Sequence, residues 1–384
     1  MLWCYIMVTY RLPKAFLKKV SADTLEIGSK LKSKKLFPPQ YNNKTYYKDI
    51  TEHEYFDALV TVRHYVKIAS DTYFNEVIGA KNTDLFMMTP SVSSPMGPGS
   101  DSEVVPIKFG KLDTFLVDSS QFGFEPLLFQ NLDKVYCYLP SMRGEKPDAR
   151  HLNQFYHCEA EIAGTLGDLT PIMEGYIRAL ADTFLAMEPL ISRMSLDAKK
   201  TKAALEKISK SKSFGKISFD TAFTKLQADK ATKKYTKTTK FGRDINSSGE
   251  SELVISETGN VPLWMYGFDR DTVAFYQKPD SRDANKTINA DLLFPPLTKN
   301  GFGGEIIGSS QRQDNAKEMI ESLKRQGISA TPYQWYIDLR NQPGYRTTSG
   351  FGLGVERFIA WSLGYESIRD VALYPRLKNI KTIP

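Results

Sequence analysis

The sequence has few of the residues that build metal centres and covalent cross-links. It contains 3 cysteines and 4 histidines among 384 residues. Cys4, Cys137 and Cys158 lie far apart without metal-ligand spacing, and an odd number of cysteines does not suit a disulfide framework. A zinc site is not expected with so few histidines. The simplest setting for such a chain is a reducing compartment, the cytoplasm.

Long apolar runs and phosphate-cradling motifs are also missing. No apolar run reaches the roughly 20 residues that a membrane-spanning helix needs. The apolar start, MLWCYIMVTYRLPKAF, lacks the basic segment and the cleavage site of a signal peptide. The pattern G-x-x-x-x-G-K-[ST] does not occur, so a P-loop is not expected. The GFGLG run lacks the strand–helix–strand context of a dinucleotide fold.

Positive charge is concentrated in one part of the chain. Lysine and arginine number 51 against 44 acidic residues, a formal net charge of +7. Much of the excess falls between Asp197 and Arg243, in AKKTKAALEKISKSKSFGK and DKATKKYTKTTKFGR. We predict one or two exposed helices in this insertion. Two interpretations stay open: contact with RNA phosphates, or a solvated lysine-rich surface, which the few aromatic residues there favour.

The rest of the sequence is typical of one large domain, since 41% hydrophobic residues can bury a substantial core. Residues 1–50 combine a basic amphipathic stretch with a connector, PPQYNNKTYY. Helical spacing of apolar residues predicts helices in EYFDALVTVRHYVKIASDTYF and TPIMEGYIRALADTFLAMEPLISRM. Runs of β-branched and aromatic residues predict strands in VYCYL, FYHCEAEI, LLFPPL and YQWYIDL. We therefore expect an α+β fold, a mostly antiparallel sheet flanked by helices.

Two distant segments carry the candidate chemistry. SMRGEKPDARHLNQFYHCEAEIAG, from Ser141 to Gly164, is predicted to form a strand, a charged loop and a second strand. GFGLGVERF is predicted to form a glycine-rich strand that enters a helix at Glu356 and Arg357. Arginines, one aromatic ring and scattered carboxylates suit a nucleotide held by stacking and charge pairing. The candidate side chains are Arg143, Glu145, Arg150, His151, Phe155 and Arg357.

These segments are part of a series of motifs that resembles the class II aminoacyl-tRNA synthetases of the asparaginyl and aspartyl branch, most closely the asparaginyl catalytic domain. The series begins near Tyr55 and comprises TP at Thr89 and Pro90, DSSQFGFE, MRGE, RHLNQF, GGEIIGSSQR, WYIDLR, GFGLGVERFIAW and SIRDVALYPR. The resemblance implies a class II synthetase-type catalytic domain at 51–384, with a variable basic insertion at about 196–250 and an N-terminal arm at 1–50. It also implies a homodimer formed through the first-motif helix and Pro90.

The resemblance implies an ATP-dependent, AMP-forming ligase. A substrate carboxylate would attack the α-phosphate of ATP, and a fixed guanidinium with Mg²⁺ would stabilise the charge that spreads over the phosphate. By similarity, Arg143 contacts the α-phosphate, while Phe155 and Arg357 enclose adenine. The other side chains that the resemblance assigns to ATP are Glu145, Arg150, His151 and Glu305.

The resemblance also assigns the metal ligands. Asp291, in NADLLFP, and Glu305, in GGEIIG, match the acids that hold Mg²⁺ in the family. Hard carboxylate oxygens suit this ion, which also binds phosphate oxygens. We therefore expect ATP and Mg²⁺ as cofactors.

Substrate choice is assigned by resemblance to four positions. Arg312, in SSQR, matches the arginine that binds the side-chain oxygen of aspartate or asparagine. Glu125 matches the acid that accepts from the amide nitrogen in the asparaginyl branch; the aspartyl branch has a lysine where this chain has Phe124. Ser119 and Gln121 would line the rest of the pocket. A carboxylate repels a substrate carboxylate, so an amide-like side chain is favoured, although a salt bridge is the alternative role for Glu125.

Several positions depart from the family. The mobile-loop glutamate that helps to bind the substrate α-ammonium is replaced by Met96 or Gly97, and a proline–histidine pair by Thr347 and Thr348. Gln154 occupies a position where glutamate is usual. By resemblance, these changes cluster around the amino acid and leave the ATP residues nearly intact. We therefore expect preserved activation with an altered substrate or acceptor.

Three functions are compatible with these observations. The favoured one is a tRNA-independent ligase that adenylates aspartate, asparagine or a close derivative and transfers the acyl group to ammonia or another amine. It is favoured because residues 1–50 are too short for the anticodon-binding barrel of the relatives. The first alternative is asparaginyl-type tRNA aminoacylation, with the basic insertion contacting RNA. The second is a non-catalytic paralogue that binds a nucleotide or an amino acid.

Overall fold

The computed structural model describes residues 10–93, 102–259 and 261–383. The α-helices are α1 (Lys14–Lys30), α2 (Tyr46–Glu52), α3 (Glu54–Asp71), α4 (Leu166–Ala186), α5 (Glu188–Met194), α6 (Ala198–Lys210), α7 (Phe219–Ala228), α8 (Ser247–Thr258), α9 (Ala316–Arg325), α10 (Gln334–Asp338) and α11 (Val355–Leu363). Within these described ranges, no helix is both long and apolar enough to cross a membrane.

The strands of the main sheet are β1 (Lys81–Asn82), β5 (Lys134–Met142), β6 (Gln154–Ala163), β7 (Gly215–Ser218), β10 (Leu263–Tyr266), β13 (Asn289–Phe294), β14 (Gly304–Gln311) and β15 (Thr348–Gly354). Smaller sheets contain β2 (Met88–Thr89), β3 (Pro106–Phe109), β4 (Leu112–Leu116), β8 (Thr236–Thr239), β9 (Gly242–Ile245), β11 (Pro279–Asp280) and β12 (Asp283–Thr287).

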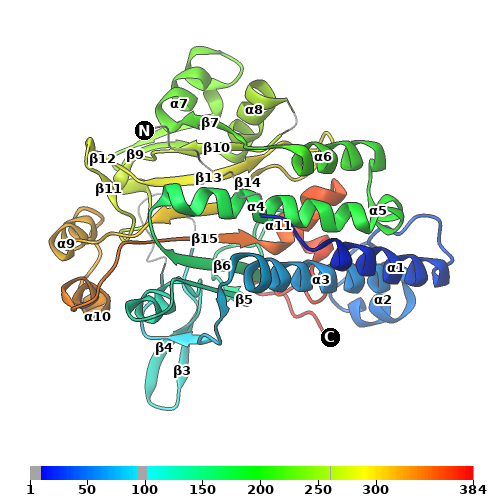
Figure 1. The fold of residues 1–384 in the computed structure, drawn as a ribbon, viewed down its shortest axis with the longest axis horizontal. Helices are drawn as coiled ribbons and strands as arrows, with labels where there is room; N and C mark the ends of the chain where they lie inside the picture. Colours follow the sequence, from blue (N-terminus) through cyan, green and yellow to red (C-terminus); the bar gives the residue numbers. More distant parts are fainter. Residues whose placement is uncertain (1–9, 94–101, 260, 384) are drawn as a thin grey trace.

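The eight-stranded main sheet runs through the middle of the molecule in the order β1-β5-β6-β15-β14-β13-β10-β7 (Figure 1). Its strand pairs are antiparallel except for the two edge pairs, β1 with β5 and β10 with β7. Helix α4 lies across one face, with α1, α3, α5 and α6 around it (Figure 1). This arrangement confirms the predicted α+β fold, and the predicted strands VYCYL and FYHCEAEI lie in β5 and β6.

The alternation of side chains along the strands separates a core face from a cavity face. On β6, Cys158 and Ala160 are buried in the main hydrophobic core together with residues of α4. Their neighbours His157 and Glu159 line a cavity instead. On β15, Leu353 belongs to the same core, whereas the flanking glycines line cavities. The face of the sheet away from α4 therefore carries the polar side chains.

Residues 10–50 of the N-terminal arm pack on the helical layer. Helix α1 contacts α3, α4 and α5, and its Val20 is fully buried. Arg11 forms an ion pair with Asp182 of α4 at 2.9 Å. At the other end of α1, Arg193 of α5 donates a hydrogen bond to the carbonyl oxygen of Gly28 at 2.7 Å. Residues 10–50 are thus part of the folded domain, a point on which the sequence made no prediction.

The basic insertion is more integrated than exposed helices would be. Strand β7 pairs with β10 and so forms one edge of the main sheet. Helices α7 and α8 enclose a second small core that contains Phe219, Phe223 and Leu253. The lysines lie on the outside, with Lys233 and Lys234 exposed. The prediction described the charged surface and missed the apolar residues beneath it.

The strand predicted for YQWYIDL is wrong, because this segment is helical. A 3-10 turn at Thr331–Tyr333 leads directly into α10. Tyr333, Tyr336 and Ile337 have helical spacing, and they pack with Phe122 in a cluster of buried side chains. Short runs of aromatic and β-branched residues do not by themselves distinguish a strand from a buried helix. Here packing against Phe122 favoured the helix.

Candidate active site

Two adjoining cavities open on the sheet face away from α4. They share Arg143, His157, Glu305 and Gly352 as lining residues, so together they form one cleft. Arg143 follows β5, His157 lies on β6, and the other two come from β14 and β15. The pairing of β6 with β15, and of β15 with β14, brings these segments together although they are far apart in the sequence.

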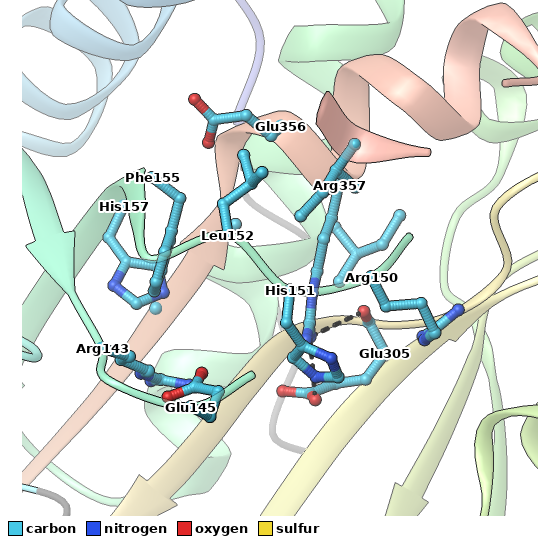
Figure 2. Close-up of a pocket in the computed structure, with 14 residues that line it drawn as sticks. Arg143, Glu145, Arg150, His151, Leu152, Phe155, His157, Glu305, Glu356 and Arg357 are labelled. Atoms are coloured by element: carbon cyan, nitrogen blue, oxygen red, sulfur yellow. Dashed lines mark hydrogen bonds and ion pairs between the residues drawn. The ribbon is translucent and has the colours of Figure 1, made fainter. Parts of the chain in front are cut away.

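The first cavity gathers every side chain that the sequence assigned to ATP (Figure 2). Figure 2 draws Phe155 and Arg357 on opposite sides of this cavity. An aromatic face and a guanidinium in this arrangement can hold a flat purine ring between them. The predicted residues that line the cavity are Arg143, Glu145, Arg150, His151, Phe155, Glu305 and Arg357.

The loop between β5 and β6 is held in place by its own hydrogen bonds. The Asn153 side chain donates to the carbonyl oxygens of Arg143 and Glu145, each at 2.7 Å. The backbone N–H of Arg143 donates in return to the Asn153 carbonyl at 3.0 Å. The Glu145 carboxylate accepts from the backbone N–H of Glu103 at 3.1 Å. These bonds orient Arg143, whose guanidinium carbon lies 5.3 Å from the centre of the Phe155 ring.

Further cations lie beside the first. Arg150 donates to the carbonyl oxygen of Gly303 at 2.6 Å and lies over the Phe302 ring at 4.3 Å. Burial, and then the positive charge of Arg357, lower the pKa of Arg150. His151 contacts Asp148 at 2.9 Å between Nδ1 and Oδ1. This end of the cleft therefore concentrates positive charge, which suits a polyphosphate.

Three carboxylates lie close to these cations. Burial, and then the charges of Glu305 and Glu250, raise the pKa of Asp291 well above its usual range. Burial and the Glu305 charge raise the pKa of Glu250 to about 7. Glu250 accepts from the backbone N–H of Glu305 at 3.1 Å, and the Glu305 carboxylate pairs with Arg357 at 3.0 Å. A bound cation would relieve the repulsion between these like charges.

Within the described part of the chain, no group of three or more His, Cys, Asp or Glu side chains is arranged to hold a metal ion. The expected pair, Asp291 and Glu305, does line the second cavity. Mg²⁺ commonly binds through one or two carboxylates together with substrate phosphates and water. The two acids present therefore fit Mg²⁺ that arrives with ATP better than a metal held by protein alone.

Arg312 lies in the second cavity, the amino-acid end of the cleft. Its Nε and Nη2 donate to Glu161 at 3.2 and 3.0 Å, and Nη1 donates to Ser310 at 2.9 Å. The guanidinium is almost fully buried and oriented by these three bonds. A Cβ atom at Gly350 would clash with it, so β15 requires a glycine at this position. The predicted substrate arginine is thus held rigidly at the cavity wall.

Ser119 and Gln121 line the same cavity. Gln121 donates to the Tyr276 hydroxyl at 2.7 Å. Ser119 donates through its hydroxyl to Glu159, which also accepts from the backbone N–H of Ser120 at 2.8 Å. Burial raises the pKa of Glu159. This end of the cleft is therefore a network of polar groups that already bind one another.

Glu125 is not among the residues that line the two cavities, so its contact with the substrate amide stays a prediction. Its carboxylate forms an ion pair with Arg340 at 2.7 Å and accepts a hydrogen bond from the Tyr336 hydroxyl. Both partners are buried, and neither lines the two cavities. The salt bridge, the alternative role considered for this residue, is what the structure contains. Tyr336 comes from α10, and Arg340 from the 3-10 turn at Leu339–Asn341 that follows it.

The departures from the family pattern lie at the margin of the cleft or beyond the described residues. Met96 and Gly97 are outside the described part of the chain. Thr347 and Thr348 precede and begin β15, and neither lines the two cavities. Gln154 begins β6 and also lines neither cavity. The described departures therefore lie outside the lining of the two cavities.

Sequence reasoning missed several lining or neighbouring side chains, among them His157, Glu159, Tyr276 and Glu250. His157 and Glu159 follow Phe155 at every second position of β6, and this alternation was a usable signal for a polar strand face. Tyr276 lies in an irregular segment, and Glu250 lies in the insertion. Nothing in the local pattern around these two residues indicates the cleft, because only the folded insertion brings Glu250 to Glu305.

Comparison with known proteins agrees with this geometry. The family model described as tRNA synthetases class II (D, K and N) matches residues 58–378. An asparagine–tRNA ligase of Pyrococcus abyssi is 34% identical over 272 residues, 70% of this chain and 58% of that protein. An asparagine–tRNA ligase of Mycoplasma pneumoniae is 29% identical over 348 residues, 88% of this chain and 72% of that protein. The chain spans about three fifths of the length of the archaeal relative.

Solved structures show the same fold. Asparaginyl-tRNA synthetase from Pyrococcus horikoshii, complexed with asparaginyl-adenylate, superposes with a TM-score of 0.76 at 27% identity, covering 89% of this chain and 74% of that chain. The Entamoeba histolytica enzyme with the same ligand has a TM-score of 0.73 at 23% identity, covering 90% and 73%. The motifs, the cleft and the matched family model together show that the chain belongs to the class II tRNA synthetase family that comprises the D, K and N enzymes.

Proposed function

We propose that this chain activates asparagine, or an amino acid with a similar amide side chain, as an acyl-adenylate. The observation that carries the proposal is a single cleft with a cationic, aromatic end beside a buried arginine. Arg143, Phe155 and Arg357 would hold the nucleotide, and Arg312 would bind the side-chain oxygen. Support also comes from the Pyrococcus horikoshii structure, whose ligand is asparaginyl-adenylate.

In the proposed reaction a carboxylate oxygen of the amino acid attacks the α-phosphorus of ATP. The bond from this phosphorus to the bridging oxygen breaks, and pyrophosphate leaves. Arg143 lines both cavities, so its guanidinium is positioned to stabilise charge on the phosphate between them. Arg150 and His151 would bind the leaving pyrophosphate. No protein nucleophile is required, because the enzyme acts by orientation and charge stabilisation.

Asp291 and Glu305 would hold Mg²⁺ together with the phosphate oxygens. The ion would supply positive charge that neutralises the polyphosphate. The raised pKa of Asp291, caused by burial and by neighbouring carboxylates, supports a cation beside it. Glu305 also pairs with Arg357, so binding of the metal and closure of the adenine pocket would be linked.

The acceptor that we propose first is tRNA. The Pyrococcus abyssi and Mycoplasma pneumoniae relatives are asparagine–tRNA ligases, which favours aminoacylation over the transfer to ammonia or another amine that the sequence alone favoured. Exposed lysines of the insertion, such as Lys233, Lys234 and Lys237, offer charge for RNA phosphates. The gathered ATP residues argue against a non-catalytic paralogue.

A homodimer stays a prediction. Helix α3 exposes Val60, and β2 exposes Met88, both apolar residues of the first-motif region. A partner subunit would cover such side chains. Light scattering at micromolar concentration should give a mass of about two chains, and a monomeric mass would contradict the dimer.

Pyrophosphate exchange into ATP tests the proposed activation. The purified protein should catalyse exchange with asparagine and Mg²⁺, and much less with aspartate. The assay is repeated with unfractionated tRNA and then with ammonium chloride, and the acylated product is identified in each case. Charged tRNA would support aminoacylation, whereas an amide product without RNA would support the amine ligase. If no tested amino acid supports exchange, either with or without RNA, activation is refuted.

A further inference from the structure

His157 occupies the junction of the cleft and has no role in the activation step. It lies on β6 and lines both cavities, together with Arg143 and Glu305. Its side chain is 13% exposed. Strand β6 is an interior strand of the sheet, between β5 and β15. The atoms that change during acyl transfer lie at such a junction, since the adenylate joins the nucleotide to the amino acid.

The two ring nitrogens of His157 have different surroundings. Nδ1 lies 2.9 Å from the Ser141 hydroxyl, a hydrogen-bond distance, and 3.8 Å from Glu159. Among the described residues, Nε2 has no hydrogen-bond partner. The Phe155 ring meets the imidazole edge to face, with ring centres 4.7 Å apart, and so fixes its plane. If Nδ1 carries the proton and donates it to Ser141, the lone pair of Nε2 stays free.

Burial, together with the positive charges around the ring, favours the neutral imidazole before substrate binds. Burial, and then the positive charges of Arg143 and Arg357, lower the pKa of His157 well below its usual range. A bound adenylate would bring a phosphate anion next to Arg143. That negative charge opposes the two arginines and raises the affinity of the imidazole for a proton. The ring is therefore unprotonated in the free enzyme and becomes a better base when the intermediate is present.

We propose that His157 is the general base of acyl transfer, the step that follows adenylate formation. This inference rests on the proposed function. An acceptor O–H or N–H attacks the acyl carbon and forms the new bond, while the acceptor proton passes to Nε2. The bond between the acyl carbon and the phosphate oxygen breaks, and AMP leaves with the electron pair. His157 then releases its proton to AMP or to water.

The role differs from that of the nearby arginines in a way that can be measured. Arg143 stabilises phosphate charge and is needed for activation. The attacking carboxylate carries no proton, so His157 has nothing to remove during activation. Removal of the base should therefore slow transfer and spare pyrophosphate exchange. General-base catalysis commonly contributes 10²–10⁴-fold.

The experiment uses the full chain and separates the two steps. The enzyme–adenylate complex is isolated by gel filtration and mixed rapidly with unfractionated tRNA, with ammonium chloride or with hydroxylamine, and AMP release is followed. We expect His157→Gln to lower transfer by at least about 10²-fold with tRNA or ammonia while exchange changes less than about threefold. Hydroxylamine, a strong nucleophile that is uncharged near neutral pH, should be affected much less. His64→Gln, an exposed histidine on α3, is the matched control.

A pH profile and a rescue sharpen the result. Wild-type transfer should rise with pH through one apparent pKa, and His157→Gln should lose that rise. Imidazole added to His157→Ala should restore part of the rate. Retained exchange proves that the variants are folded. Transfer that is unchanged in His157→Gln, or that falls in proportion to exchange, would overturn the proposal. Absence of exchange in the wild type would refute the proposed function itself, a distinct outcome.

Discussion

The two ends of the cleft differ in how their charged groups are held. At the nucleotide end, Arg143 and Arg150 face the cavity with few protein partners for their charge. At the amino-acid end, Arg312 already donates to Glu161 and Ser310, and the buried Glu125 is paired with Arg340. Arginines with few protein partners can bind any polyphosphate, whereas polar groups that already bind one another can accept a substrate side chain of only one shape. The nucleotide end should therefore tolerate little loss of charge, and the amino-acid end little change of shape.

The largest expected effect tests whether the charge of Arg143 acts on the phosphate. Arg143→Ala should lower pyrophosphate exchange about 10³-fold, because it removes the guanidinium between the two cavities. Thermal unfolding should stay near that of the wild type. Arg282→Ala is the control, since this exposed arginine pairs with Asp280 and lines neither cavity. Exchange within tenfold of the wild type would show that Arg143 does not act on the phosphate.

The next effect concerns the buried pair at the amino-acid end. Arg340→Met should lower the free energy of unfolding by about 3 kcal/mol, because it leaves Glu125 buried without its cation. Denaturant titration measures this difference. Addition of Glu125→Gln to the variant should recover part of the loss, and a double-mutant cycle gives the coupling. A stability equal to the wild type would mean that the pair is not formed.

The same variant has a defined pH dependence. Burial raises the pKa of Glu125 to about 7 in the wild type, with Arg340 opposing the rise. A group whose pKa is higher in the folded than in the unfolded state stabilises the folded state at pH values below its unfolded pKa. This stabilisation is lost as the pH rises through the folded pKa. Without Arg340 the pKa rises further, so the loss continues above pH 7. The stability gap between wild type and variant should therefore widen from pH 7 to pH 9, and a constant gap would contradict this.

A smaller effect tests the shape of the network. Arg312→Lys keeps the charge but cannot make the paired bonds to Glu161 and the bond to Ser310 at once. We expect the KM for the amino acid to rise about 30-fold, or about 2 kcal/mol, with the KM for ATP almost unchanged. Exchange kinetics measured against each substrate separate the two constants. An equal rise in both would mean that the two ends are not independent.

The smallest effect separates the two roles considered for Glu125. Because its carboxylate does not line the cleft, Glu125→Gln should change the KM for asparagine less than about threefold, or below about 1 kcal/mol. Its partner Tyr336 can still donate to the new amide oxygen. A large rise in this KM at unchanged stability would restore Glu125 as a substrate ligand and contradict the geometry.

The sequence predicted the nucleotide end better than the amino-acid end for a physical reason. Arg143 and Phe155 belong to one hairpin, whose strands β5 and β6 pair locally. Arg357 follows β15, which pairs with β6, so only one long-range contact completes the set. At the amino-acid end the partner of Glu125 depends on α10, which was predicted to be a strand. The sequence offered a salt bridge for Glu125 without naming its cation, and only the folded chain brings Arg340, just after α10, to it.

Periodicity and local motifs in the sequence were enough to predict several helices and strands and to identify the family. Apolar spacing identified α3 and α4, β-branched runs identified β5 and β6, and the quoted motifs identified the family. Each of these features depends on neighbours within about 20 residues, which the chain itself specifies.

Only the tertiary structure decided which buried groups meet. It brought Glu250 of the insertion to Glu305, paired Glu125 with Arg340, and placed His157 at the junction of the cleft. Buried polar groups must be satisfied, and the partner available to each is set by the packing of the whole domain. A local pattern shows that a side chain is polar, and the fold decides what it binds.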